Sequence, residues 1–262
     1  MGRFLRRFRV MLSVYNALMV EVRSEIFLWM LATAFPLILM GIWIQAAQGG
    51  KLPLDASQFA QYFAALFIVR QFTVVWVIYE FEVDVLQGRL SPFLLQPIDP
   101  VWRHVAAHSA ERFTRFPFVF AALGIVLLLI PQARWSPSLF DITAGAVSIY
   151  LAFALRFLIQ YTFALFAFWS ERASAIEQVW FMVYLFLSGL LGPLDVYSPT
   201  MQNIANATPF PLIMYYPAQI LLGRPVNLVW VIGLLLMWTI IFFVINRLLW
   251  RAALKRYSAM GA

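Results

Sequence analysis

The chain contains no cysteine and little charge. The lack of cysteine excludes disulfide bonds and sites that depend on a thiol. Charged residues are 12% of the 262 residues and hydrophobic residues are 63%. A soluble domain is usually about one quarter charged and about half apolar. The composition therefore predicts a protein that lies mostly within a lipid bilayer.

The sequence also lacks a motif for using chemical energy. The phosphate-binding loop of NTPases has the pattern Gly-x-x-x-x-Gly-Lys-Ser/Thr, and neither Lys51 nor Lys255 stands in such a pattern. No predicted span carries a Ser/His pair, paired aspartates or a His-x-x-x-His set, so an intramembrane enzyme is not expected. Carboxylates are expected only near span ends, which argues against a proton-coupled transporter or a channel that works alone.

Long apolar runs predict an all-α, polytopic membrane protein with six transmembrane helices. Each run has about 20 residues, enough to cross roughly 30 Å of hydrocarbon. The predicted spans cover residues 27–47, 59–80, 113–131, 142–169, 176–196 and 228–250. We expect the whole chain, 1–262, to form one transmembrane domain.

The positions of lysine and arginine predict the orientation. Most of them lie before the first span, between the second and third, and after the sixth, whereas the opposite side carries only Lys51, Arg134 and Arg224. Because positive residues favour the cytoplasmic side, both termini are expected there. An anionic inner leaflet accounts for the net charge of +7, and no nucleic acid partner is needed.

Residues 1–26 predict an amphipathic helix that lies in the membrane interface. Apolar side chains recur along one face of this helix. They are Phe4, Phe8, Met11, Tyr15, Leu18, Val22 and Ile26. Two interpretations stay open: a simple membrane anchor, or an elbow helix that moves the first span when a partner moves.

The loop 81–112 between the second and third spans predicts a docking surface. Gly88 and several prolines interrupt it, and apolar residues stand between them. Apolar residues in a cytoplasmic loop are typical of contact with another protein. Asp99 followed by Pro100 predicts the start of a helix that continues into the third span. Glu82 and Asp84 could pair with a basic surface of the partner.

The run Gly88–Pro100, Gly-Arg-Leu-Ser-Pro-Phe-Leu-Leu-Gln-Pro-Ile-Asp-Pro, resembles the cytoplasmic loop of small bacterial permeases of the type-2 ABC exporter family. Gln96 departs from the basic residue expected in many relatives. The break at Ser188–Asp195 and the prolines of 197–227 match the extracellular re-entrant segment of that family.

The resemblance implies a transporter of two permease chains, identical or related, and two ATPase chains in the bacterial inner membrane. ATP and Mg²⁺ would be bound by the ATPase chains, and this chain would bind no cofactor. The cargo would be an amphipathic small molecule or a lipid-like compound. The implied ATPase-coupling residues are Gly88, Arg89, Leu90, Phe93, Leu94, Leu95, Pro97, Asp99 and Pro100.

Arg70 and Arg156 lie deep inside predicted spans. A charge at that depth costs a few kcal/mol or more, so it usually faces protein or a wet pathway. The two arginines could bind neighbouring polar groups such as Gln160, or could attract an anionic group of a cargo. No acidic partner for them is expected within the membrane. The predicted transport pathway comprises Arg70, Arg156, Phe63, Phe67, Gln160, Gly189, Gly192 and Pro193.

His104 and His108 are spaced four residues apart on the predicted loop helix, with Glu111 three residues further. Such a face could hold a metal ion, but a complete site needs a fourth ligand. We therefore expect no metal site, and we expect both histidines to be solvated.

Overall fold

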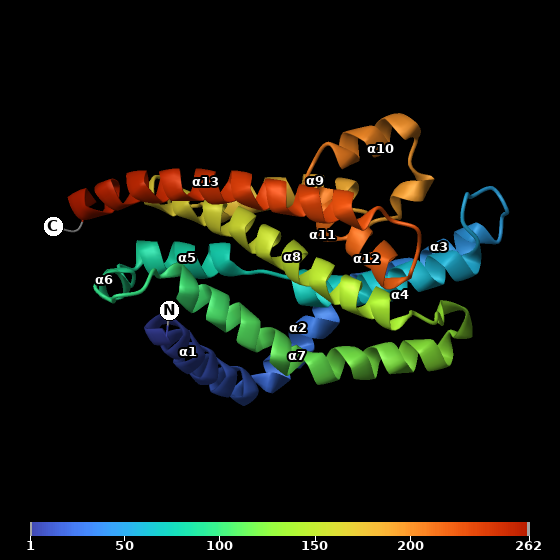
Figure 1. Ribbon diagram of the computed structural model, residues 1–262, viewed down its shortest axis with the longest axis horizontal. Coiled ribbons are helices and arrows are strands. Elements are labelled where there is room, and N and C mark those ends of the chain that lie inside the picture. The colour runs from blue at the N-terminus through green and yellow to red at the C-terminus, as the bar shows by residue number, and fades with distance from the viewer. Residues whose placement is uncertain (1, 261–262) are drawn as a thin grey trace.

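The computed structural model describes residues 2–260, so Met1 of the predicted interfacial helix and the last two residues of the predicted domain lie outside the described part. Within that part every regular element is a helix, as predicted. The helices form an elongated bundle. The two ends of the described chain and α6 (Ser91–Leu94) lie at one end of it, and α10 (Pro199–Asn206) and the turn after α3 (Phe35–Ala47) lie at the other (Figure 1).

Five helical stretches are long and apolar enough to cross a membrane. Two are interrupted: α2 (Arg23–Ala32) is followed by α3 (Phe35–Ala47), and α4 (Ala56–Thr73) by α5 (Val77–Leu86). The others are α7 (Val101–Leu129), α8 (Leu139–Ala164) with the 3-10 turn η2 (Leu165–Phe168), and α13 (Leu228–Met260). These five agree in place with predicted spans one to four and six.

The fifth predicted span, 176–196, forms a shorter helix than expected. It corresponds to α9 (Ser174–Leu187), whose 14 residues reach about 21 Å at about 1.5 Å each. That length is below the roughly 30 Å of a hydrocarbon core. The helix ends because Gly189 adopts a φ of 87°, which turns the chain. Six spans are therefore not confirmed.

Two spans begin one turn earlier than predicted because capping boxes define their first residues. Asp55 accepts a hydrogen bond from the Gln58 amide, and the Gln58 side chain accepts one from the Asp55 amide. Ser138 and Asp141 make the same reciprocal pair at the start of α8. Each box satisfies amide groups that a helix start leaves unpaired.

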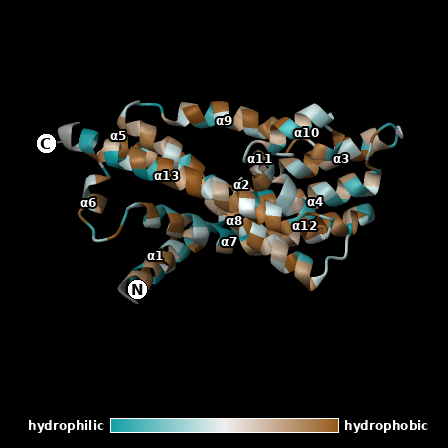
Figure 2. Cartoon of the chain, turned by 45° about the horizontal axis from the view of Figure 1, so that its top comes forward, coloured by the Kyte–Doolittle hydropathy of each residue, from teal (hydrophilic) through white to brown (hydrophobic). Residues whose placement is uncertain are grey.

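The α4–α5 span is the central element of the bundle. In the most apolar 18-residue stretch of this span, 83% of the residues are buried. The corresponding share is 22% in α7 and 11% in α13. The main hydrophobic cluster surrounds α4 with side chains from α3, α8 and α12 (Tyr215–Leu221). Figure 2 shows that α13 is hydrophobic over much of its length. Its exposed apolar surface therefore needs lipid or another chain as its surroundings.

The N-terminal helix α1 (Gly2–Glu21) packs along α7. Phe4 and Phe8 contact the ring of Trp102, and Phe8, Met11 and Tyr15 are half-buried. Part of the predicted apolar stripe thus faces protein. The helix ends at Glu21, before the predicted limit at residue 26, and its position in the membrane interface stays a prediction.

The segment before α13 contains short elements that fold back onto the bundle. They are η3 (Leu194–Val196), α10 (Pro199–Asn206), α11 (Phe210–Ile213) and α12 (Tyr215–Leu221). The helices α11 and α12 pack against α8, and α12 also packs against α4. Trp135, which follows the 3-10 turn η1 (Pro131–Ala133), donates its indole N–H to the Leu221 carbonyl at 3.1 Å. That 197–227 re-enters the membrane from outside stays a prediction.

Candidate functional site

The predicted coupling loop is an ordered connection between α5 and α7. Gly88, with a φ of 68°, turns the chain after α5, and the Leu90 amide donates to the Asp84 carbonyl at 3.2 Å. The short helix α6 (Ser91–Leu94) follows. Leu90 is fully buried against a second hydrophobic cluster that includes Phe81 and Trp250. The apolar contacts of Leu90 therefore hold the loop against the bundle.

The predicted coupling residues divide by exposure. Leu90 and Pro100 are buried and support the loop, whereas Gly88, Arg89, Leu95 and Pro97 are exposed; Phe93, Leu94 and Asp99 lie between these extremes. Leu95 is 89% exposed, the highest value among the exposed large hydrophobic side chains. A fully exposed leucine on an ordered loop is the feature here that best fits contact with another protein.

Two polar contacts connect the loop to other helices. Arg247 of α13 donates to Asp99 at 2.6 Å, and Arg7 of α1 donates to the carbonyl of Pro97 at 2.8 Å. An ion pair between Arg103 of α7 and Asp84 of α5 joins the two helices that flank the loop. A displacement of the loop would therefore act directly on α1 and α13.

The acidic residues of the loop have partners within the chain. Asp84 pairs with Arg103, and Glu82 accepts hydrogen bonds from the amide and the hydroxyl of Ser174 at 2.6 and 3.1 Å. Both carboxylates therefore have roles within the chain, and their pairing with a basic surface of a partner stays a prediction. Glu82 satisfies an amide at the start of α9.

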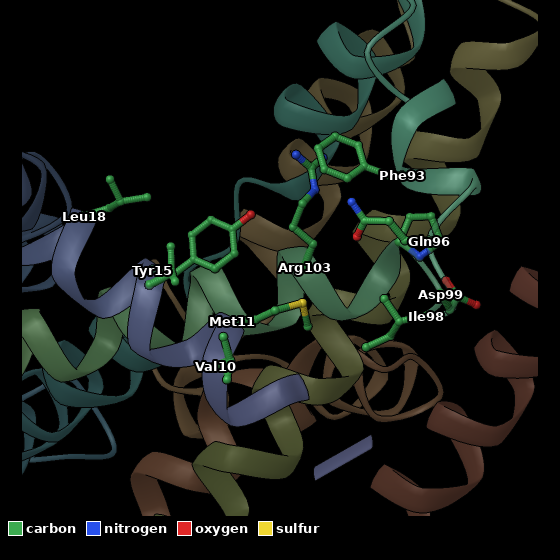
Figure 3. A pocket seen from close by; sticks show the side chains of 11 residues that line it. Val10, Met11, Tyr15, Leu18, Phe93, Gln96, Ile98, Asp99 and Arg103 are labelled. Atoms are coloured by element: carbon green, nitrogen blue, oxygen red, sulfur yellow. The ribbon is translucent and has the colours of Figure 1, made fainter. Parts of the chain in front are cut away.

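A groove separates α1 from the coupling loop (Figure 3). Its volume is about 270 Å³, and Met11, Tyr15 and Ile98 are among its lining residues. The Arg103 guanidinium stacks on the Phe93 ring at 3.9 Å from the ring centroid. Burial raises the pKa of the Tyr15 phenol, and the nearby Arg103 opposes this by a smaller amount. Tyr15 is therefore neutral at physiological pH.

We expect Asp99→Ala to lower the free energy of unfolding by about 1–2 kcal/mol. Asp99 accepts the Val101 amide at 3.0 Å at the start of α7, and such caps are worth about 0.5–2 kcal/mol. The partly exposed ion pair with Arg247 adds up to about 1 kcal/mol. Denaturant unfolding of the full chain in detergent measures the loss. Asp99→Asn keeps the cap and should lose less, and an alanine variant as stable as the parent would contradict the expectation.

Within the membrane-spanning part, Arg70 of α4 and Arg156 of α8 line one cavity of about 190 Å³. Gln160 also lines it, so three of the predicted pathway residues come together. The wall also includes Trp76, at the break between α4 and α5, and Glu177 of α9. These three residues thus meet beside the non-helical stretch between α4 and α5.

Arg156 and Glu177 are both held by neutral partners. The Arg156 guanidinium donates to the Tyr184 hydroxyl at 2.7 Å and lies over the Tyr184 ring. Gln160 donates to the Glu177 carboxylate at 2.5 Å. Glu177 is 5% exposed. The expectation that no acid lies near these arginines is wrong, because α9 begins beside the cavity.

Several polar atoms around the cavity have no hydrogen-bond partner within the described residues. They are Nε and one terminal nitrogen of Arg70, Nε of Arg156, one carboxylate oxygen of Glu177 and the amide oxygen of Gln160. Arg70 also lies 5.8 Å from the Phe181 ring centroid. Buried polar groups normally find partners, so these atoms mark a place where a polar group can bind.

The other predicted pathway residues lie elsewhere. Phe63 and Phe67 are fully buried in the core around α4. Gly189 lies against Tyr62 and Gly192 against Trp43, and Pro193 follows in the same loop. None of these residues lines the cavity. Their role in transport stays a prediction.

The two histidines are buried, so the expectation that they are solvated is wrong. His104 and His108 are each 2% exposed. His104 contacts the Glu80 carboxylate at 3.1 Å. His108 accepts a hydrogen bond from the Trp76 amide at 3.0 Å and contacts the His104 carbonyl. The part of the chain with described positions contains no group of three residues suited to hold a metal ion.

Comparison with known proteins identifies the family. A family model described as ABC-2 family transporter protein matches residues 55–261, which include the central span, the coupling loop and the arginine-lined cavity. A search of curated proteins gave no match. Membrane proteins of this kind generally work with an ATPase partner. Since the match covers most of the sequence and five helices can span a bilayer, the chain is a multi-pass membrane protein that belongs to the ABC-2 transporter family.

Proposed function

We propose that this chain is the permease subunit of an ATP-driven exporter in the bacterial inner membrane. It would move an amphipathic small molecule or lipid-like compound outward, and a separate pair of ATPase chains would bind ATP and Mg²⁺. The permease itself would bind no cofactor and catalyse no reaction. The observation that carries the proposal is the exposed Leu95 on a loop that polar contacts connect to α1 and α13.

The geometry supports a simple transmission of force. An ATPase that contacts Leu95 from outside the bundle would move the loop as its own subunits close on ATP. The Asp99–Arg247 contact would carry that displacement to α13, and the contact of Arg7 with the Pro97 carbonyl would carry it to α1. A second permease chain, identical or related, would cover part of the apolar surface that α7 and α13 leave exposed. The distribution of lysine and arginine would place both termini and the loop in the cytoplasm.

The test is affinity purification of the tagged full chain from its native membrane in mild detergent, followed by mass spectrometry. We expect an ABC ATPase in fixed proportion, and Leu95→Asp should reduce it at least ten-fold. Loss of one buried leucine costs about 1.5–3 kcal/mol, and about 1.4 kcal/mol is a factor of ten. The matched control is Leu139→Asp, which places the same change on a 77% exposed leucine at the start of α8. No ATPase with a folded parent chain would refute the proposal.

A self-standing secondary transporter or channel is the second candidate, and Glu177 favours it. A buried carboxylate in a membrane protein can carry protons. Transport in vesicles separates the two candidates. A proton uncoupler should stop a secondary transporter, whereas removal of ATP should stop an ABC exporter.

A further inference from the structure

The cavity between α4, α5, α8 and α9 combines features of a binding site for an anion. Its two arginines come from different helices, and it contains one carboxylate, Glu177. With all three side chains ionised, the local charge is positive by one unit. An entering anionic group of one charge would balance the site.

The arginine nitrogens offer donors to an anion. Arg156 is 3% exposed, and neither its Nε nor two nitrogens of Arg70 find a hydrogen-bond partner among the described residues. A guanidinium in a poorly solvated place is matched best by a phosphate or a carboxylate, which can accept several of its N–H groups.

The backbone beside the arginines is not helical. Val74, Val75 and Trp76 line the cavity, and Val74 has an extended conformation with a ψ of 137°. Irregular backbone at membrane depth is tolerated where it is buried in protein or borders a polar cavity. The break therefore places non-helical peptide groups next to the two arginines.

The size of the cavity limits what it can enclose. Sites for whole drug-sized ligands usually occupy about 300–1,000 Å³. A cavity of 190 Å³ holds a head group, so the remainder of a larger molecule must extend outside it. Tyr79 and Gln178 are exposed where α5 and α9 border the cavity. Val179, Met182 and Phe186 expose further apolar surface along α9.

We propose that this cavity binds the phosphate or carboxylate head of an anionic amphiphile, with Arg70 and Arg156 as its ligands, while the apolar tail lies along α9. Glu177 competes with the anion for the positive charge and so limits its affinity. The identification of the bound amphiphile as transported cargo rests on the proposed function. The existence of the binding site does not depend on it.

The test is calorimetric titration of the purified full chain in dodecyl maltoside with decyl phosphate, corrected for protein-free micelles. We expect saturable binding of decyl phosphate and none of decyltrimethylammonium. Arg70→Gln and Arg156→Gln should each weaken binding about 10- to 100-fold, as expected for a lost charged hydrogen bond. Arg172→Gln, the same change at an exposed arginine just before α9, should have no effect.

Glu177→Gln gives an effect of opposite sign. Removal of the competing carboxylate should tighten binding of decyl phosphate roughly three- to ten-fold. A purely structural role of Glu177 could only weaken it. If either glutamine variant of the arginines fails to fold, Arg70→Lys and Arg156→Lys keep the charge and should retain part of the affinity.

Equal affinity of the parent and both arginine variants, or equal binding of the cationic amphiphile, would overturn the site. If phosphatidic acid competes with decyl phosphate, the site binds a two-chain membrane lipid. If it does not compete, the site binds a single-chain amphiphile. Either result supports an anionic head group in the cavity. No ATP or partner is present in this titration. Its failure is therefore distinct from failure to recover an ATPase.

Discussion

Gly189→Ala is expected to lower the free energy of unfolding by about 3–5 kcal/mol. Gly189 has a φ of 87°, where a side chain costs roughly 1–2 kcal/mol. An added Cβ would lie 2.6 Å from the Tyr62 hydroxyl and 3.0 Å from Cβ of Tyr215. Overpacking of this kind usually costs about 1–3 kcal/mol more. The Tyr62 hydroxyl also donates to the Gly189 carbonyl at 2.7 Å, and that bond would be displaced.

The consequence would extend beyond one residue, because the loop after α9 holds the segment before α13. The Tyr215 amide donates to the Ser188 carbonyl at 3.1 Å. Denaturant unfolding of the full chain in detergent measures the loss. Gly124→Ala is the matched control, since it lies inside α7 with open space around it and should be neutral or stabilising by up to about 1 kcal/mol.

A double variant separates the collision from the backbone strain. Tyr62→Phe removes the oxygen nearest to the new methyl group, so its cost combined with Gly189→Ala should be less than the sum of the two single costs. Full additivity would show that the close approach of Tyr62 to Gly189 is not the cause. A Gly189→Ala chain as stable as the Gly124→Ala control would contradict the fold of this loop.

The sequence predicted the places of five spans well because their signal is local. Each is a run of apolar residues, and the capping boxes at Asp55 and Ser138 only moved two starts by a turn. The grouping of both termini with the coupling loop at one end also agrees with the distribution of arginine and lysine (Figure 1). The positions of the spans and the grouping of charged segments follow from the local composition of the chain, so they can be predicted without knowing how the helices pack.

The break in the central span could not be predicted, because its cause lies on another helix. Residues 74–76 are Val-Val-Trp, with no glycine or proline to interrupt a helix. The partners of the interrupted backbone are on α7: His108 accepts the Trp76 amide, and Arg112 donates to the Phe72 carbonyl at 2.8 Å. Arg115, at the start of the predicted third span, is likewise held inside the bundle: it is 1% exposed and donates to Gln71.

Glu177 was missed for a related reason. It stands near the start of a predicted span, where an acid is ordinary, but α9 is short and begins beside the cavity. A signal was present, since Glu177 and Tyr184 are seven residues apart and therefore share one face of a helix. Tyr184 is the partner of Arg156. A search for polar residues on the face of Tyr184 could have placed this acid near the arginines.

His108→Leu is expected to lower the free energy of unfolding by about 1–3 kcal/mol, the usual cost of a buried polar group without a partner. Each nitrogen of the His108 ring takes part in one hydrogen bond. Nδ1 faces the His104 carbonyl at 2.9 Å and must donate, so Nε2 of the neutral ring accepts the Trp76 amide. Leucine offers no acceptor, so the Trp76 amide would lose its hydrogen-bond partner on α7.

Two further variants of α7 decide whether the missing acceptor is the cause. His108→Gln retains an oxygen at similar reach and should recover part of the lost stability. Ser109→Ala is the neighbouring control: its hydroxyl donates only to the Val105 carbonyl of the same helix, so its loss should cost less than about 0.5 kcal/mol. Equal stability of His108→Leu and Ser109→Ala would mean that the Trp76 amide finds another partner. A large loss recovered by glutamine would instead establish that α7 maintains the break on which the arginine-lined cavity depends.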